Sequence, residues 1–267
     1  MPAVVARGVR FNTQWLGPEG APLVVMVHGM LTGNVASWYF GLGAALAADH
    51  RVFMYDQRGH GRSQAPVTGY TLTDLAADLD ALVAGAGPAV LVGHSFGGVV
   101  ALRRALDHPG AVRSVVAIDS FEPGGAASAG PEGDDVIDLG AVLAWGRQRR
   151  MRAMAERRGR GTGRRNRATA EQVLLGGTTL LADLRRDAHL DREQLGSLAV
   201  PVLWVAGTES PFRAEVAALG AALPDARTER VELPGGHALH LDCPDRLAAV
   251  VLAHVARTLC PEEANHG

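Results

Sequence analysis

Hydrophobic residues along the chain form short continuous runs that alternate with longer amphipathic stretches. The short runs are rich in β-branched residues and lie at residues 23–29, 50–56, 89–94, 112–119, 200–207 and 227–234. Stretches rich in Ala and Leu lie at residues 72–87, 96–108, 212–222 and 244–259. Near-continuous apolar strands separated by helices are typical of a parallel sheet covered on both faces. The pattern therefore predicts an α/β fold.

The alternation stops between residues 120 and 198, where the sequence is Arg-rich and Gly-rich without a clear strand. We predict a mostly helical cap over residues 123–195, inserted after the sixth strand. The sheet domain then consists of two parts, residues 1–122 and 196–267. No internal repeat is visible.

Charge is concentrated in one stretch of the predicted cap. Residues 145–170 contain ten arginines and one acidic residue, so their charge is +9, and the rest of the chain carries −11 to give the net −2. Arginine binds phosphate in a bidentate manner, so this stretch could dock an acidic acyl carrier protein or coenzyme A. The alternative is a solvated loop with too few apolar residues to pack. The arginine run has no interleaved aromatic residues, and nucleic-acid binding is not expected.

Several classes of protein are disfavoured by the sequence. Arg7 interrupts the N-terminal apolar residues, so a signal peptide is not expected, and no apolar stretch approaches the ~20 residues of a membrane span. Cys243 and Cys260 are spaced neither like metal ligands nor like a disulfide framework. We therefore expect a cytoplasmic protein that needs no metal or organic cofactor and does not bind membranes.

A G-x-S-x-G motif, Gly93 to Gly97, lies between a predicted strand and a predicted helix. In this context the central residue of the motif occupies a tight turn that only small neighbours permit. Ser95 is therefore the candidate nucleophile, held at the sheet edge with its hydroxyl exposed. A serine hydroxyl needs a base to take its proton. His237, in a Gly-rich turn after the last predicted strand, is the first candidate base, and His240 is the alternative.

Four motifs in order resemble the α/β-hydrolase family, and they occupy residues 27–30 ("VHGM"), 55–63 ("YDQRGHGRS"), 93–98 ("GHSFGG") and 233–237 ("LPGGH"). The resemblance implies a mostly parallel eight-stranded sheet flanked by helices. It also implies an oxyanion hole formed by the backbone N–H groups of Met30 and Phe96. Asp56 matches a position that is normally structural in the family, where it is expected to organise its loop with Arg58.

The carboxylate that should orient the histidine is not at the usual position, because that position is Ser210. Asp119 ends the strand that follows the nucleophile's own strand and helix, and catalytic groups in such sheets collect beyond the carboxyl ends of the strands. This placement resembles thioesterase domains of polyketide and nonribosomal peptide synthesis. Glu209 and Glu122 are the alternative acids, and Asp119 could instead simply cap nearby N–H groups.

These residues predict a serine hydrolase that cleaves a thioester or carboxylic ester through an acyl-enzyme intermediate. An acyl thioesterase or a cyclase of natural-product biosynthesis is the narrower interpretation. Two alternatives stay open: a lyase or cyclase of the same fold that works without a covalent intermediate, and a ligand-binding receptor that turns over slowly.

Overall fold

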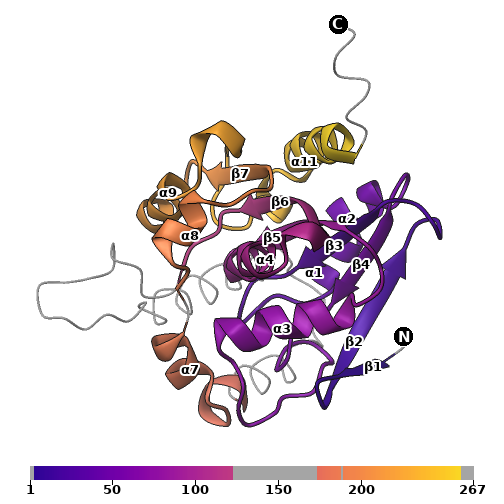
Figure 1. The fold of residues 1–267 in the computed structure, drawn as a ribbon, viewed down its shortest axis with the longest axis vertical. Helices are drawn as coiled ribbons and strands as arrows, with labels where there is room; N and C mark the ends of the chain where they lie inside the picture. Colours follow the sequence, from indigo (N-terminus) through magenta and orange to yellow (C-terminus); the bar gives the residue numbers. More distant parts are fainter. Residues whose placement is uncertain (1–2, 123–172, 188, 260–267) are drawn as a thin grey trace, which may run out of the picture.

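The computed structural model describes residues 3–122, 173–187 and 189–259. Its centre is an eight-stranded sheet with the strand order β1-β2-β4-β3-β5-β6-β7-β8 (Figure 1). The strands are β1 (Ala3–Ala6), β2 (Val9–Leu16), β3 (Leu23–Val27), β4 (Arg51–Tyr55), β5 (Ala89–His94), β6 (Val112–Ile118), β7 (Val202–Gly207) and β8 (Thr228–Leu233). Strand β2 pairs antiparallel with β1 and β4, and every other pair is parallel. The predicted α/β fold with a mostly parallel sheet is confirmed.

The hydrophobic pattern did not identify β1 and β2, which form one edge of the sheet. In β2, Val9 and Phe11 are buried whereas Arg10 between them is exposed. An antiparallel strand at a sheet edge has one face toward water, so it lacks the continuous apolar run that marks the parallel strands. All six residues of β5, at the centre of the sheet, are buried.

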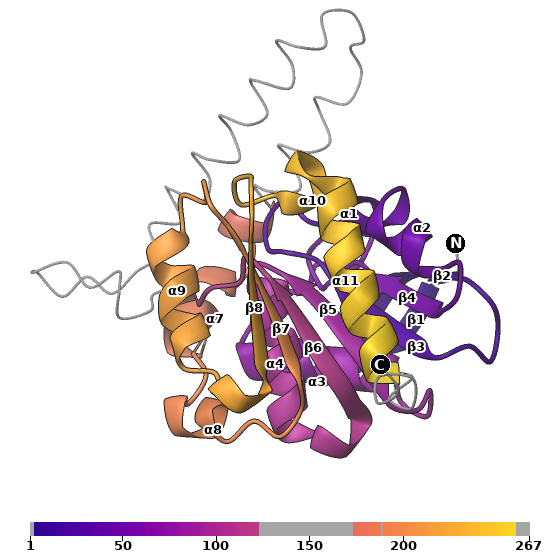
Figure 2. The same cartoon turned by 90° about the horizontal axis from the view of Figure 1, so that it is seen from above.

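Helices cover both faces of the sheet. One core cluster packs residues of α3 (Leu72–Leu82), α4 (Phe96–Asp107) and α9 (Arg213–Ala221) against one face. A second cluster packs α1 (Ala36–Tyr39), α2 (Leu42–Leu46), α10 (Leu239–Asp242) and α11 (Pro244–Leu259) against the other. Figure 2 shows α11 in front of the sheet, with α3 and α4 behind it.

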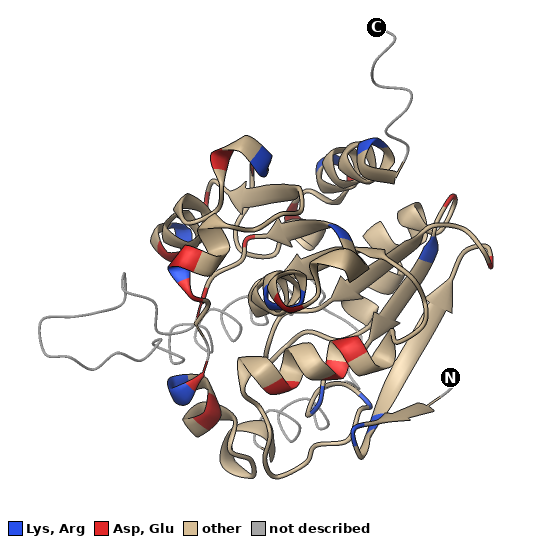
Figure 3. Cartoon of the chain, viewed as in Figure 1, with Lys and Arg blue, Asp and Glu red and all other residues tan. Residues whose placement is uncertain are grey.

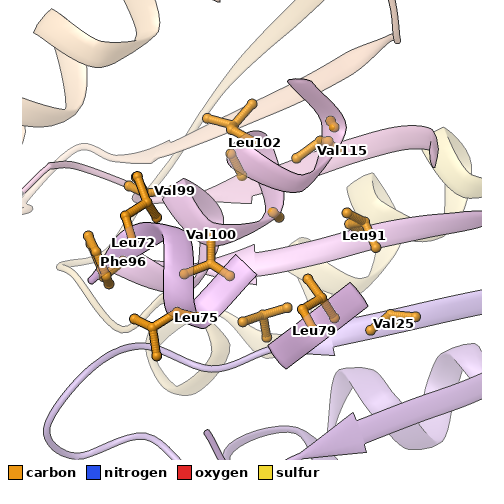
Figure 4. Close-up of a cluster of buried hydrophobic side chains, with 14 of the residues drawn as sticks. Val25, Leu72, Leu75, Leu79, Leu91, Phe96, Val99, Val100, Leu102 and Val115 are labelled. Carbon is orange, nitrogen blue, oxygen red and sulfur yellow. The ribbon is translucent and has the colours of Figure 1, made fainter. Parts of the chain in front are cut away.

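The first cluster shows how the amphipathic pattern becomes packing. Thr71 caps α3 by accepting a hydrogen bond from the Asp74 N–H at 3.0 Å, as an N-cap threonine is expected to do. From there Leu72, Leu75 and Leu79 point toward α4 and the sheet (Figure 4). The helix α3 also carries acidic residues, which Figure 3 shows in red along it.

The predicted cap is described only near its C-terminal end. Helices α7 (Leu180–Arg186) and α8 (Arg192–Gly196) lie there, and Leu180, Leu184 and Leu195 are buried in the first core cluster. Residues 123–172, including the Arg-rich stretch 145–170, lie outside the described residues, so the division into core and cap stays a prediction. In the described part of the chain, no helix has both the length and the apolar character that crossing a bilayer requires.

Candidate active site

Ser95 occupies the turn between β5 and α4 in a backbone conformation that non-glycine residues seldom adopt, with φ 56° and ψ −131°. A Cβ on Gly93 would lie 2.4 Å from the Gly97 carbonyl oxygen, and a Cβ on Gly97 would lie 2.4 Å from that of Val27. Both glycines of the motif are therefore required by close backbone packing. Ser95 as a whole residue is only 8% exposed, although an exposed hydroxyl was expected.

His237 lies in the loop between β8 and α10, and its side chain is buried. Its Nε2 is 3.0 Å from Ser95 Oγ. Two hydrogen bonds fix the loop: His94 Nε2 donates to the His237 carbonyl oxygen at 2.7 Å, and the Gly236 N–H donates to Asp242 Oδ2 at 3.0 Å. The structure therefore brings His237, the first candidate base, against the candidate nucleophile.

Asp119 is the first residue after β6 and is fully buried. Its Oδ2 lies 2.7 Å from His237 Nδ1. An ionised carboxylate only accepts hydrogen bonds, so Nδ1 carries a proton and Nε2 presents its lone pair to the Ser95 hydroxyl. This is the tautomer that a general base for Ser95 needs.

Two further donors hold the Asp119 carboxylate, and the sequence pattern anticipated neither. The Gly207 N–H donates to Oδ1 at 2.8 Å, and the Ser210 hydroxyl donates to Oδ2 at 2.6 Å. Gly207 ends β7 and Ser210 lies in the loop that follows, at the usual position of the acid in the family. The sequence signal for the Ser210 contact was the lack of a carboxylate at position 210, because the loop after β7 lies beside the residue that ends β6.

Neither alternative acid lies at His237 Nδ1. Glu209 is exposed. Glu122 is buried, but its carboxylate accepts from the Leu190 N–H at 2.6 Å and from Arg192 at 2.5 Å. Asp119 is thus the carboxylate that contacts the imidazole, and its additional bond to Gly207 means that it also caps a backbone N–H.

His240 does not occupy the position of a base for Ser95. It lies in α10, and its ring packs 4.9 Å from the His94 ring and 5.4 Å from the Trp38 ring, measured between centroids. His94 itself donates to the loop of His237, as described above. Burial, together with the nearby rings of His237 and His240, lowers the pKa of His94 well below its usual value. His94 is therefore a neutral donor.

Two buried histidines shape the loop after β3. His28 Nε2 accepts from the Gln57 N–H at 2.9 Å, and His60 Nε2 accepts from the Leu31 N–H at the same distance. Burial lowers the pKa of His28, and it lowers the pKa of His60 to about 3. Both rings are neutral and hold the loop that contains Met30.

Asp56 organises this region without Arg58. Its carboxylate accepts from Asn12 Nδ2 at 2.8 Å and from the backbone N–H groups of Val35 at 2.7 Å and Arg62 at 2.8 Å. Arg58 instead makes a bidentate ion pair with Asp78 of α3, at 2.5 and 2.6 Å. Asp56 thus organises its loop as expected, but the expected help of Arg58 is wrong, because the Arg58 guanidinium pairs with α3 instead.

The expected oxyanion donors lie on the two elements that flank Ser95. Phe96 is the first residue of α4, so its N–H has no acceptor within the helix. Met30 is the third residue after β3 and precedes Leu31, whose φ is 67°. Leu31, Ser95 and Asp119 all have positive φ, and such strain in non-glycine residues clusters at functional sites. The oxyanion role of Met30 and Phe96 stays a prediction.

The chemistry of the site can be stated from the described residues alone. Within those residues, no group of three or more His, Cys, Asp or Glu side chains is arranged to hold a metal ion. Asp119, His237 and Ser95 form a continuous hydrogen-bonded series at the carboxyl ends of β5 and β6. This arrangement can move a proton from the serine hydroxyl to the imidazole while the carboxylate stabilises the resulting charge.

Comparison with known proteins agrees with this architecture. The putative carbamate hydrolase RutD of Variovorax paradoxus (strain S110) is 45% identical over 116 residues, which are 42% of this chain and 43% of that protein. The match thus spans less than half the length of this relative.

Solved structures match over far more of the chain. The enol-lactonase from Burkholderia xenovorans LB400 superposes with a TM-score of 0.70 at 23% identity, covering 96% of this chain and 100% of that one. The thioesterase domain from the curacin biosynthetic pathway superposes with a TM-score of 0.66 at 23% identity, covering 94% and 98%. At these identities the likeness shows the fold alone.

The profile of the alpha/beta hydrolase family matches residues 24–250, a range that contains the elbow, the acid and the histidine loop. The chain therefore belongs to the alpha/beta hydrolase family.

Proposed function

We propose that this protein is a serine hydrolase that cleaves a thioester or carboxylic ester through an acyl-enzyme intermediate. One observation carries the proposal: His237 Nε2 lies 3.0 Å from Ser95 Oγ while His237 Nδ1 lies 2.7 Å from Asp119 Oδ2. A nucleophile within reach of a base, itself oriented by a third group, is the geometric signature of an activated serine.

In the proposed mechanism Ser95 Oγ attacks the substrate carbonyl as its proton passes to His237 Nε2. Asp119 stabilises the imidazolium that forms. The backbone N–H groups of Met30 and Phe96 donate to the oxyanion, where each is worth about 3 kcal/mol in the transition state. His237 then protonates the leaving group, and water repeats the sequence to release the acid. An internal hydroxyl or amine of the substrate, attacking in place of water, would give a cyclic product.

The comparisons support a hydrolase and are compatible with several leaving groups. The relatives' names include a carbamate hydrolase, an enol-lactonase and a thioesterase domain. Asp119 at the end of β6 resembles the placement in thioesterase domains, which favours a thioester. The narrower proposal is an acyl thioesterase or cyclase of natural-product biosynthesis that takes its acyl group from a carrier protein or coenzyme A.

Fluorophosphonate labelling followed by intact-protein mass spectrometry tests the acyl-enzyme route. We expect one adduct on the wild-type protein, at Ser95, and none on Ser95→Ala, because only an activated serine attacks phosphorus readily. Ser114→Ala is the matched control, since Ser114 is a buried serine near the start of β6, outside the hydrogen-bonded series of Asp119, His237 and Ser95. An unlabelled wild-type protein would favour a lyase or cyclase without a covalent intermediate. An adduct with slow turnover and retained ligand would favour a receptor.

The leaving group is tested by comparing kcat/KM for aryl esters, acyl-CoA, carrier-bound acyl thioesters and lactones. We expect the thioesters to be preferred. A preference for lactones or simple esters would reject the thioesterase proposal and keep the serine hydrolase. A preference for carrier-bound over free thioesters would support a carrier protein as partner.

A further inference from the structure

Ser210 occupies the usual position of the catalytic acid in the family, and its hydroxyl contacts Asp119, the acid that this chain presents to His237. Ser210 Oγ lies 2.6 Å from Asp119 Oδ2, the same oxygen that lies 2.7 Å from His237 Nδ1. Ser210 is 8% exposed and Asp119 is fully buried, so water does not compete freely for this contact. Two donors from different loops thus converge on one carboxylate oxygen.

The direction of the bond follows from chemistry. An ionised carboxylate accepts only, so the Ser210 hydroxyl donates. The Ser210 oxygen in turn accepts from the Phe212 N–H at 3.3 Å, and the Ser210 N–H donates to the Gly207 carbonyl oxygen at 3.2 Å. The hydroxyl is therefore held by its own loop in the orientation that reaches Asp119.

The end of β7 and the loop after it together hold both oxygens of the carboxylate. The Gly207 N–H fixes Oδ1 at 2.8 Å, and Ser210 fixes Oδ2. These two bonds together fix the plane of the carboxylate independently of His237. Without Ser210, Oδ2 would be restrained by His237 alone, and the carboxylate could turn about its bond to the Gly207 N–H.

An acid at position 210 is incompatible with Asp119. A carboxylate there would place two negative charges in contact in a buried site, and one of them would have to take up a proton. A small neutral donor avoids this conflict and adds a hydrogen bond to a charged acceptor, which is among the stronger hydrogen bonds in proteins.

We infer that Ser210 is a positioning residue, which orients the Asp119 carboxylate toward His237 and shares its charge. This inference rests on the proposed function of Asp119 and His237. The bond also withdraws charge from Oδ2. Its loss therefore makes Oδ2 a stronger acceptor for the His237 Nδ1–H even as the carboxylate becomes less well oriented.

Ser210→Ala tests the inference with two readouts. We expect kcat for an aryl ester to fall about ten-fold with KM nearly unchanged, because a hydrogen bond to a charged group is lost. The downfield proton NMR signal of the His237 Nδ1–H should move further downfield, which a general packing defect would not cause. Ser210→Thr keeps the hydroxyl and should keep both readouts near wild type.

Ser114→Ala is the control for removing a buried serine hydroxyl, and we expect it to leave both readouts unchanged. Ser210→Ala with wild-type kcat, or with lower kcat and an unmoved signal, would overturn the inference, as would Ser210→Thr behaving like Ser210→Ala. The NMR readout needs no substrate. A wild-type protein inactive on every ester and unlabelled by fluorophosphonate, but with the expected shift in Ser210→Ala, would reject the proposed function and keep the contact.

Discussion

Asp119 and Glu122 leave the end of β6 three positions apart, and both carboxylates are buried. Asp119 accepts from Gly207, Ser210 and His237. Glu122 accepts from the Leu190 N–H and from Arg192, and His189 Nδ1 lies 3.6 Å from Glu122 Oε2. Burial and the presence of several donors therefore do not distinguish the two groups.

The difference lies in which donor can pass a proton onward. His237 has a second nitrogen that faces Ser95, so in the proposed mechanism the charge of Asp119 acts on a reacting group. Arg192 cannot lose its proton in a protein, and its contact with Glu122 holds the first residue of α8 against the segment that follows β6. A buried carboxylate thus becomes a catalytic or a structural group according to its partner.

The largest expected effect comes from removing the charge of Asp119. Asp119→Asn should lower kcat about 10⁴-fold, because the histidine loses the carboxylate that fixes its tautomer and stabilises its charged form. Glu122→Gln should change kcat only a few-fold. Steady-state ester hydrolysis by both variants checks this. Glu209→Gln, an exposed change, is the control, and a large loss in that variant with an active Asp119→Asn would return the acid to the loop after β7.

Glu122 should matter more for stability than for kcat. Glu122→Gln retains an acceptor for the Leu190 N–H but loses the ion pair with Arg192. We expect the free energy of unfolding to fall by about 1–2 kcal/mol, at the lower end for a charged hydrogen bond because the Arg192 side chain is 46% exposed. Urea unfolding monitored by circular dichroism measures this. Unchanged stability would remove the structural role assigned to Glu122.

Low pH should reduce the free energy of unfolding of the protein, because it contains buried neutral histidines. His28, His60 and His94 have lowered pKa values in the folded protein, whereas an unfolded chain binds these protons near pH 6.5. Below that pH the unfolded state holds more protons, so the free energy of unfolding falls as the pH falls. Each histidine contributes up to about 1.4 kcal/mol per pH unit. For His60 this continues down to its folded pKa of about 3.

Urea unfolding at several pH values between 7 and 5 measures this slope. His60→Gln should reduce it by the share of one histidine, since a glutamine oxygen can accept from the Leu31 N–H without taking up a proton. An equal slope in the variant would show that His60 does not remain neutral in the folded state.

Much of the fold and site followed from local pattern. Near-continuous apolar runs predicted the parallel strands, and the elbow motif identified Ser95, because a turn that needs Gly93 and Gly97 leaves few sequences possible. The edge strands β1 and β2 were missed in the hydrophobic pattern, because a half-solvated strand has a mixed pattern. The pairing of Arg58 was misassigned, since Asp78 lies twenty positions away and only the packing of α3 brings it close.

The sequence by itself determined the parallel strands of the sheet, the candidate nucleophile, the first candidate base and the short set of acids that could serve it, because each depends on a local motif or on strand order. Tertiary structure alone placed Asp119 rather than Glu122 or Glu209 at His237, and turned Ser210 toward Asp119. These contacts join loops after β6, β7 and β8, and their geometry depends on backbone bonds between strands that no local pattern encodes.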